Sequence, residues 1–120
     1  MNSEIKEKKS YLLHWMYDFI EDDDEPAYLV QHVEACDQIL TSFINEVAKS
    51  QHKSEFSWLS AQIEDLVNKL NALNFKLDHQ LIESDQREDI CALVELIVRN
   101  AGHDYPKKAA ESLSSSLAVF

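Results

Sequence analysis

The scarcity of chain-breaking residues is the feature that most constrains this fold. The 120 residues include one glycine, Gly102, and two prolines, Pro26 and Pro106. A β-sandwich or barrel needs many turn residues, and an α/β fold needs glycine where strands meet helices. Leu, Ala, Glu, Gln and Lys, which favour helices, are frequent. We therefore predict an all-α fold, with residues 1–120 forming one domain. The predicted architecture is an antiparallel bundle of four longer helices plus a short C-terminal helix.

Apolar residues recur at helical spacing in the first half of the chain. The first helix is expected over residues 3–20, with a buried stripe of Ile5, Leu12, Trp15, Met16, Phe19 and Ile20. The second is expected over residues 25–50, because Asp24 is a suitable N-cap and Pro26 fits the first turn. Its apolar residues alternate steps of three and four, which is a heptad seam: Leu29, Val33, Cys36, Leu40, Phe43 and Val47.

The third helix is expected over residues 55–82, on a seam of Phe56, Leu59, Ile63, Leu66, Leu70, Leu73 and Leu77, prolonged by Leu81. At 1.5 Å per residue it would be roughly 40 Å long, more than a compact domain of this size requires. Either the helix bends near Asn71 and Asn74, or it projects and supports a homodimer.

The fourth helix is expected over residues 86–101. Asp85 is its predicted N-cap and Glu88 the capping partner, while Gly102 suits a left-handed residue after the last turn. A short fifth helix is expected after Pro106, with Ala110, Leu113 and Leu117 on its apolar face.

The two cysteines, Cys36 and Cys91, lie inside helical patterns, so we expect free thiols that pack as small apolar groups. Residues 1–10 are polar, without the apolar run of a signal peptide. No segment approaches the ~18 apolar residues of a membrane span. We therefore expect a cytoplasmic protein that does not associate with membranes.

Charge is distributed unevenly along the chain. Acidic residues outnumber basic ones 22 to 11, a net charge of −11. Residues 10–48 contain no lysine or arginine, and they hold nine acids: Asp18, Glu21, Asp22, Asp23, Asp24, Glu25, Glu34, Asp37 and Glu46. A second acidic cluster, Glu83, Asp85, Glu88 and Asp89, surrounds the start of the fourth helix. Such a field attracts basic partners, and it disfavours nucleic acids and anionic membranes.

Tyr17 and Tyr28 flank the acidic loop that includes residues 21–25, and they lie off the main apolar stripes. Tyrosine anchors beside acidic residues are typical of a surface that binds a basic protein, although either ring could pack at the rim of the core. We predict a partner-binding site that consists of Tyr17, Asp18, Glu21, Asp22, Asp23, Asp24, Glu25, Tyr28, Glu34 and Asp37. The first two expected helices and the acidic run between them form a hairpin, which we call the acidic hairpin. The binding-site prediction requires that Lys53, Lys69, Lys76 and the C-terminal lysines do not fold against it.

Cofactor and metal motifs are missing from the sequence. A single glycine excludes phosphate-binding loops of the Walker or dinucleotide type. No histidine follows a glutamate by three residues, as di-iron bundles require, and the isolated cysteines do not form a zinc motif. The acidic loop also lacks the glycine spacing of a calcium-binding helical hand. We expect no cofactor and no metal, and we do not expect an enzyme.

The segment from Val98 to Tyr105 resembles the Arg-Asn…His signature of the HEPN helical-bundle ribonucleases. The resemblance covers eight residues and implies that Arg99 and His103 form a catalytic pair. Only three residues separate the two, one fewer than the family signature requires, and an acidic enzyme would repel RNA. Helix termination gives the alternative interpretation, with Arg99 complementing the helix dipole.

These features predict a small acidic binding module that neutralises or regulates a basic protein partner. Its most concrete version is an immunity protein or antitoxin against a cationic nuclease toxin, because negative charge speeds association with a positive cleft. A homo-oligomeric assembly protein built on the third helix and a HEPN-like ribonuclease are the two alternatives.

Overall fold

The computed structural model describes residues 3–104 and 107–117. These residues form five helices and no strand: α1 (Ser3–Asp22), α2 (Val30–Lys49), α3 (Phe56–Lys76), α4 (Ser84–Asn100) and α5 (Lys107–Leu117). The prediction of an all-α fold with four longer helices and a short C-terminal helix is confirmed, whereas the antiparallel packing stays a prediction. Pro106 and the end of the HEPN-like segment at Tyr105 lie outside the described residues, as does the side chain of Ala110.

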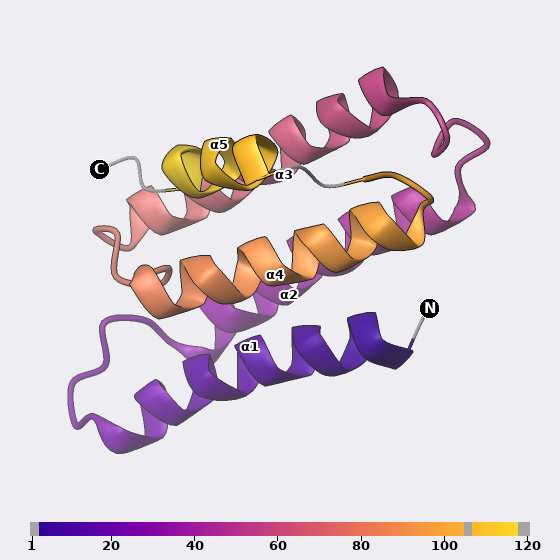
Figure 1. Ribbon diagram of the computed structural model, residues 1–120. Coiled ribbons are helices and arrows are strands. Elements are labelled where there is room, and N and C mark those ends of the chain that lie inside the picture. The colour runs from indigo at the N-terminus through magenta and orange to yellow at the C-terminus, as the bar shows by residue number, and fades with distance from the viewer. Residues whose placement is uncertain (1–2, 105–106, 118–120) are drawn as a thin grey trace.

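The helices pack as a ring around one core (Figure 1). α1 packs against α2 and α4, α2 against α3, and the short α5 joins α3 to α4. The core is almost entirely aliphatic, with Leu12, Met16, Leu40, Leu70 and Leu93 among its fully buried side chains. The connections 23–29 and 77–83 lie at the same end of the molecule (Figure 1). This shared end matters because both connections carry acidic residues.

The predicted buried stripe of the first helix is wrong at two positions. Trp15 and Phe19 are exposed, and Leu13 is buried in their place beside Leu12 and Met16. At about 100° per residue, Trp15 and Phe19 lie roughly a quarter turn from the centre of the buried face. The buried face of α1 is centred near Leu12, Leu13 and Met16 because α1 contacts both α2 and α4.

The second helix begins five residues later than predicted, at Val30, and Asp24 is not its N-cap. Leu29 holds the N-cap position, and its backbone N–H donates to His32 Nδ1 at 2.8 Å. Asp23 accepts a hydrogen bond from the Glu25 N–H at 3.0 Å. This local turn competes with helix formation, because short acidic side chains readily bind the backbone two residues ahead.

The third helix is neither a continuous rod to residue 82 nor a bent one; it ends at Lys76. Asp78 and His79 adopt left-handed φ angles of 53° and 61°. The buried Asn74 side chain then fixes the returning chain: its Oδ1 accepts from the N–H groups of Leu81 (3.1 Å) and Ile82 (2.9 Å). Its Nδ2 donates to the Ile82 carbonyl at 3.3 Å. Leu81 is therefore a buried loop residue and does not extend the helix.

The fourth helix begins at Ser84, with Glu83 as N-cap, so the predicted Asp85–Glu88 capping pair is wrong. The Gln86 side chain accepts a hydrogen bond from the Glu83 N–H at 3.2 Å. At the other end Gly102 has a φ of 94°, which confirms its predicted left-handed conformation. Its N–H donates to the Arg99 carbonyl and the His103 N–H donates to the Val98 carbonyl, the two bonds of a Schellman motif.

Both cysteines are free; Cys36 is fully buried in the core, and Cys91 is half-buried against it. Within residues 3–104 and 107–117, none of the helices has both the length and the apolar content that a bilayer-spanning segment needs.

Candidate protein-binding site

Three aromatic side chains form an exposed row along α1. Tyr11, Trp15 and Phe19 follow one another at intervals of four residues and are 56%, 43% and 49% exposed. Tyr11 and Trp15 meet edge to face, with ring centroids 6.1 Å apart. We call these three residues the aromatic ridge. Large apolar side chains that gather at one surface mark an interaction site more often than singly exposed ones do.

Two cavities flank the ridge and share Phe19 and Gln86. The end cavity, of about 340 Å³, is lined by Phe19, Asp22, Asp23, Pro26, Ala27, Tyr28, Gln80, Glu83 and Gln86. The side cavity, of about 330 Å³, lies between α1 and the first turns of α4 and is lined by Tyr11, Trp15, Phe19, Asp85, Gln86, Glu88 and Asp89. We call the two cavities together the acidic groove.

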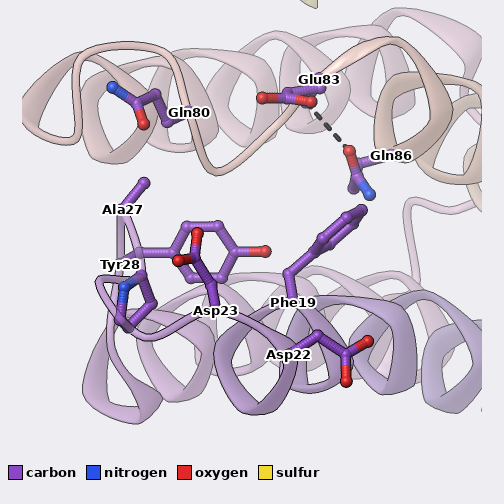
Figure 2. Close-up of a pocket in the computed structure, with 9 residues that line it drawn as sticks. Phe19, Asp22, Asp23, Ala27, Tyr28, Gln80, Glu83 and Gln86 are labelled. Carbon is purple, nitrogen blue, oxygen red and sulfur yellow. Dashed lines mark hydrogen bonds between the residues drawn. The ribbon is translucent and has the colours of Figure 1, made fainter.

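The end cavity is built from two connections that are distant in sequence. In Figure 2, Phe19 and Tyr28 project into it from the α1–α2 side, and Gln80 and Glu83 lie on the opposite wall. The hydrogen bond between Glu83 and Gln86 fixes the second wall at the start of α4. Asn74 holds the 77–83 connection in place through its hydrogen bonds to the backbone of Leu81 and Ile82. The cavity is therefore preformed by the fold.

The acidic groove carries six carboxylates and no lysine or arginine among its lining residues: Asp22, Asp23, Glu83, Asp85, Glu88 and Asp89. None of the six makes an ion pair with another residue of the described chain. The two acidic clusters of the sequence, about sixty residues apart, thus share one surface whose carboxylates have no ion-pair partner in the described chain. Field lines concentrate in such a depression and attract cations.

The crowding of these charges is visible at Asp89. Partial burial raises the pKa of its carboxyl above the ordinary value, and the negative charges of Asp85 and Glu88 raise it further, while Lys8 opposes the shift. The groove therefore holds negative charge at some expense to folding stability, since like charges one turn apart on a helix repel. A cation placed in the groove would relieve this repulsion.

The ten predicted site residues divide into three groups. Asp22, Asp23 and Tyr28 line the end cavity, although Tyr28 is buried and presents only part of its ring. Glu21, Asp24 and Glu25 are exposed next to it. Tyr17, Asp18, Glu34 and Asp37 line neither cavity of the groove.

The residues of this last group lie near the α1–α2 contact. Burial raises the pKa of Tyr17, and the nearby charges of Glu34 and Asp37 add to the rise. Lys9 pairs with Asp37 at 2.7 Å and also donates to the Thr41 hydroxyl at 3.0 Å, so the charge of Asp37 is partly cancelled. Asp18 lies 3.3 Å from His14. The predicted hairpin surface is therefore weaker than the acidic groove as a source of negative field.

Two of the lysines that could have neutralised the acidic hairpin, Lys53 and Lys69, are engaged elsewhere. Lys53 donates to the carbonyl of Ala48 at 3.3 Å, and Lys69 pairs with Asp65 at 2.9 Å. Within the described part of the chain, Lys76 forms no ion pair with the acidic residues of the hairpin. The side chains of the two C-terminal lysines lie outside the described residues.

Sequence reasoning missed the aromatic ridge because it assigned Trp15 and Phe19 to the core. The four-residue spacing of Tyr11, Trp15 and Phe19 was a usable signal, since it defines a row distinct from Leu12 and Met16. The second acidic cluster was not assigned to the binding site for another reason, because nothing in the sequence places the start of α4 beside the end of α1. That cluster consists of Glu83, Asp85, Glu88 and Asp89.

The structure also places the residues on which the two alternative functions depend, the homo-oligomeric assembly protein and the HEPN-like ribonuclease. Of the predicted α3 seam, Leu59, Leu66 and Leu70 are buried in the protein's own core, and only Phe56 is exposed. Arg99 pairs with Glu95 through Nε and Nη2, at 3.2 and 3.1 Å. His103 Nε2 lies 2.7 Å from the Lys53 carbonyl, and its ring contacts Phe56. These contacts tie the end of α4 to the α2–α3 connection.

Tyr28, which lines the end cavity, should make the free energy of unfolding depend on pH. Burial is the largest cause that raises its pKa from 10.0 to about 12, followed by the negative charge of Glu83 and then by the neighbouring Cys36. Between these two pH values the unfolded chain loses the phenolic proton while the folded chain retains it, so the free energy of unfolding falls as pH rises. Its contribution is fully present below pH 10.0. Tyr28→Phe should make this fall shallower in denaturant titrations across the window, and parallel curves would contradict the assignment.

Among the described residues, no group of three or more His, Cys, Asp or Glu side chains is arranged to hold a metal ion. No protein-family model matches the chain, and no curated protein or solved structure matches it significantly.

Proposed function

We propose that this protein is a small acidic binding module that neutralises or regulates a basic protein partner. One observation carries the proposal: six carboxylates from the ends of α1 and α4 surround an exposed aromatic ridge, and none is paired within the described chain. Exposed aromatic rings supply contact area at low entropic cost, and the surrounding charges supply orientation and speed.

The most concrete version is an immunity protein or antitoxin that covers the positive cleft of a nuclease toxin. Such an inhibitor must bind before the toxin acts, and electrostatic steering raises association rates by about 10 to 10³-fold. The proposal includes a cytoplasmic location, where free thiols such as Cys36 and Cys91 persist.

The proposal is tested by capturing proteins from the native host on three immobilised forms of the chain. The first is the wild type, and the second carries lysine at Asp22, Asp23 and Glu88. The third carries lysine at Glu64, Asp104 and Glu111, three exposed acids outside the acidic groove. Both triple variants change the net charge equally, so both should lose non-specific ionic capture to the same extent.

A basic protein should be retained by the wild type and the third form and lost from the second. Its retention should weaken as salt shortens the Debye length. If the two triple variants retain the same proteins, the acidic groove is not a binding site and the proposal fails.

A further inference from the structure

We propose that the acidic groove selects arginine over lysine, and that its partner places one guanidinium group on each side of Phe19. This inference rests on the proposed function and names the chemistry by which the basic partner is recognised. The occupant is a segment of that partner which presents two arginines about one helical turn apart.

Each cavity combines aromatic walls with carboxylates. In the end cavity the rings of Phe19 and Tyr28 stand near Asp22, Asp23 and Glu83. In the side cavity all three rings of the aromatic ridge stand near Asp85, Glu88 and Asp89. An ionic attraction alone would need only the carboxylates, so the rings add a second requirement on the cation.

Arginine meets both requirements and lysine meets one. A guanidinium group is planar and weakly hydrated, stacks on aromatic faces, and donates two parallel hydrogen bonds to a carboxylate. Cation–π contacts in proteins involve arginine more often than lysine. A lysine ammonium is a strongly hydrated point charge, and it loses more hydration on entering a cavity walled by rings.

The spacing of the two arginines follows from α1. Phe19 borders both cavities, so the two sites are adjacent along the helix. Neighbouring rings of the aromatic ridge are four residues apart, a rise of about 6 Å at 1.5 Å per residue. A partner helix with arginines at positions i and i+4 repeats this rise and can lie along α1 with one arginine directed into each cavity.

The test uses two synthetic alanine-rich helical peptides that are identical except at positions i and i+4, which are both arginine or both lysine. Trp15 lies in the side cavity and reports binding by its fluorescence. Trp58 lies on α3 and is replaced in a Trp58→Phe variant, which leaves Trp15 as the only tryptophan. We expect the arginine peptide to bind at least about fivefold more tightly than the lysine peptide, the scale of a solvent-exposed cation–π contact.

Phe19→Leu in the same background keeps an apolar side chain and every charge but removes the shared aromatic face. It should reduce the preference for the arginine peptide over the lysine peptide, because Phe19 is the one ring that borders both cavities. Phe75→Leu is the matched control, because Phe75 is 71% exposed on α3 and lines neither cavity. That control should retain the full preference.

The outcomes separate this inference from the proposed function. Equal affinities of the wild-type groove for the two peptides, or no binding of either, overturn arginine selection. The proposed function is decided independently by capture of a basic protein that depends on Asp22, Asp23 and Glu88. A preference that is undiminished in Phe19→Leu also overturns the inference, because the ring shared by the two cavities would then contribute nothing to it.

Discussion

Replacing Asp22, Asp23 and Glu88 with lysine should slow association with the basic partner by at least about tenfold at low ionic strength. The three side chains are exposed at the two cavities of the acidic groove and make no ion pair within the described chain. Each reversal replaces an attraction with a repulsion. Three lysines then face the three remaining carboxylates, Glu83, Asp85 and Asp89, so the negative field of the groove is largely cancelled. The dissociation rate should change less, because steering acts before contact forms.

Stopped-flow mixing at several salt concentrations measures this effect. The wild-type rate should fall as salt increases, and the rates of wild type and variant should converge once the Debye length is only a few ångströms, about 3 Å at 1 M. The control with lysine at Glu64, Asp104 and Glu111 carries the same net charge and should slow association much less. Equal slowing in both variants would show that net charge, and not the acidic groove, governs the rate.

Replacing Asn74 with alanine should lower the free energy of unfolding by about 3 kcal/mol. Asn74 is 2% exposed, and its side chain binds two backbone N–H groups and one carbonyl of the 77–83 connection. Alanine cannot replace any of these bonds, and the freed N–H groups of Leu81 and Ile82 are on residues that are themselves buried. An unsatisfied buried polar group costs about 1–3 kcal/mol.

Thermal and denaturant unfolding measure this loss, which corresponds to a decrease of about 10 °C in midpoint for a domain of this size. Asn68→Ala on the same helix is the control, since Asn68 is exposed and its replacement should change stability by less than about 0.5 kcal/mol. A similarly small effect at Asn74 would mean that the connection is held by Leu81 and Ile82 packing alone. Because Gln80 and Glu83 line the end cavity, Asn74→Ala should also weaken partner binding under conditions where the variant is folded.

The interiors of the helices were predictable because their apolar residues follow the 3.6-residue period. Leu40 in α2, Leu66 in α3 and Val94 in α4 are all buried, as their spacing indicates. The helix ends were less predictable. Asp24, Asp85 and Leu81 were misassigned, because several nearby side chains compete for the same backbone groups. At two of these ends, side chains of other residues, Asp23 and Asn74, make the bonds that set the boundary.

Only part of the candidate site was predictable from the sequence. Local charge density is a property of the sequence, so the acidic segment that includes Asp22 and Asp23 was found directly. Burial of one face of an amphipathic helix depends on its neighbours, so the exposure of Trp15 and Phe19 was not found. Their apolar character predicted a core position, and the packing of α1 between α2 and α4 left them at the surface.

The sequence alone determined that this chain is all helical and that its excess negative charge lies in two clusters. Both follow from local properties: backbone freedom restricted by the near absence of glycine and proline, and the identity of consecutive side chains. Only the tertiary structure decided that the two clusters meet around an aromatic ridge. That meeting depends on contacts between residues about sixty positions apart, which arise when the ring of helices closes and brings the end of α1 beside the start of α4.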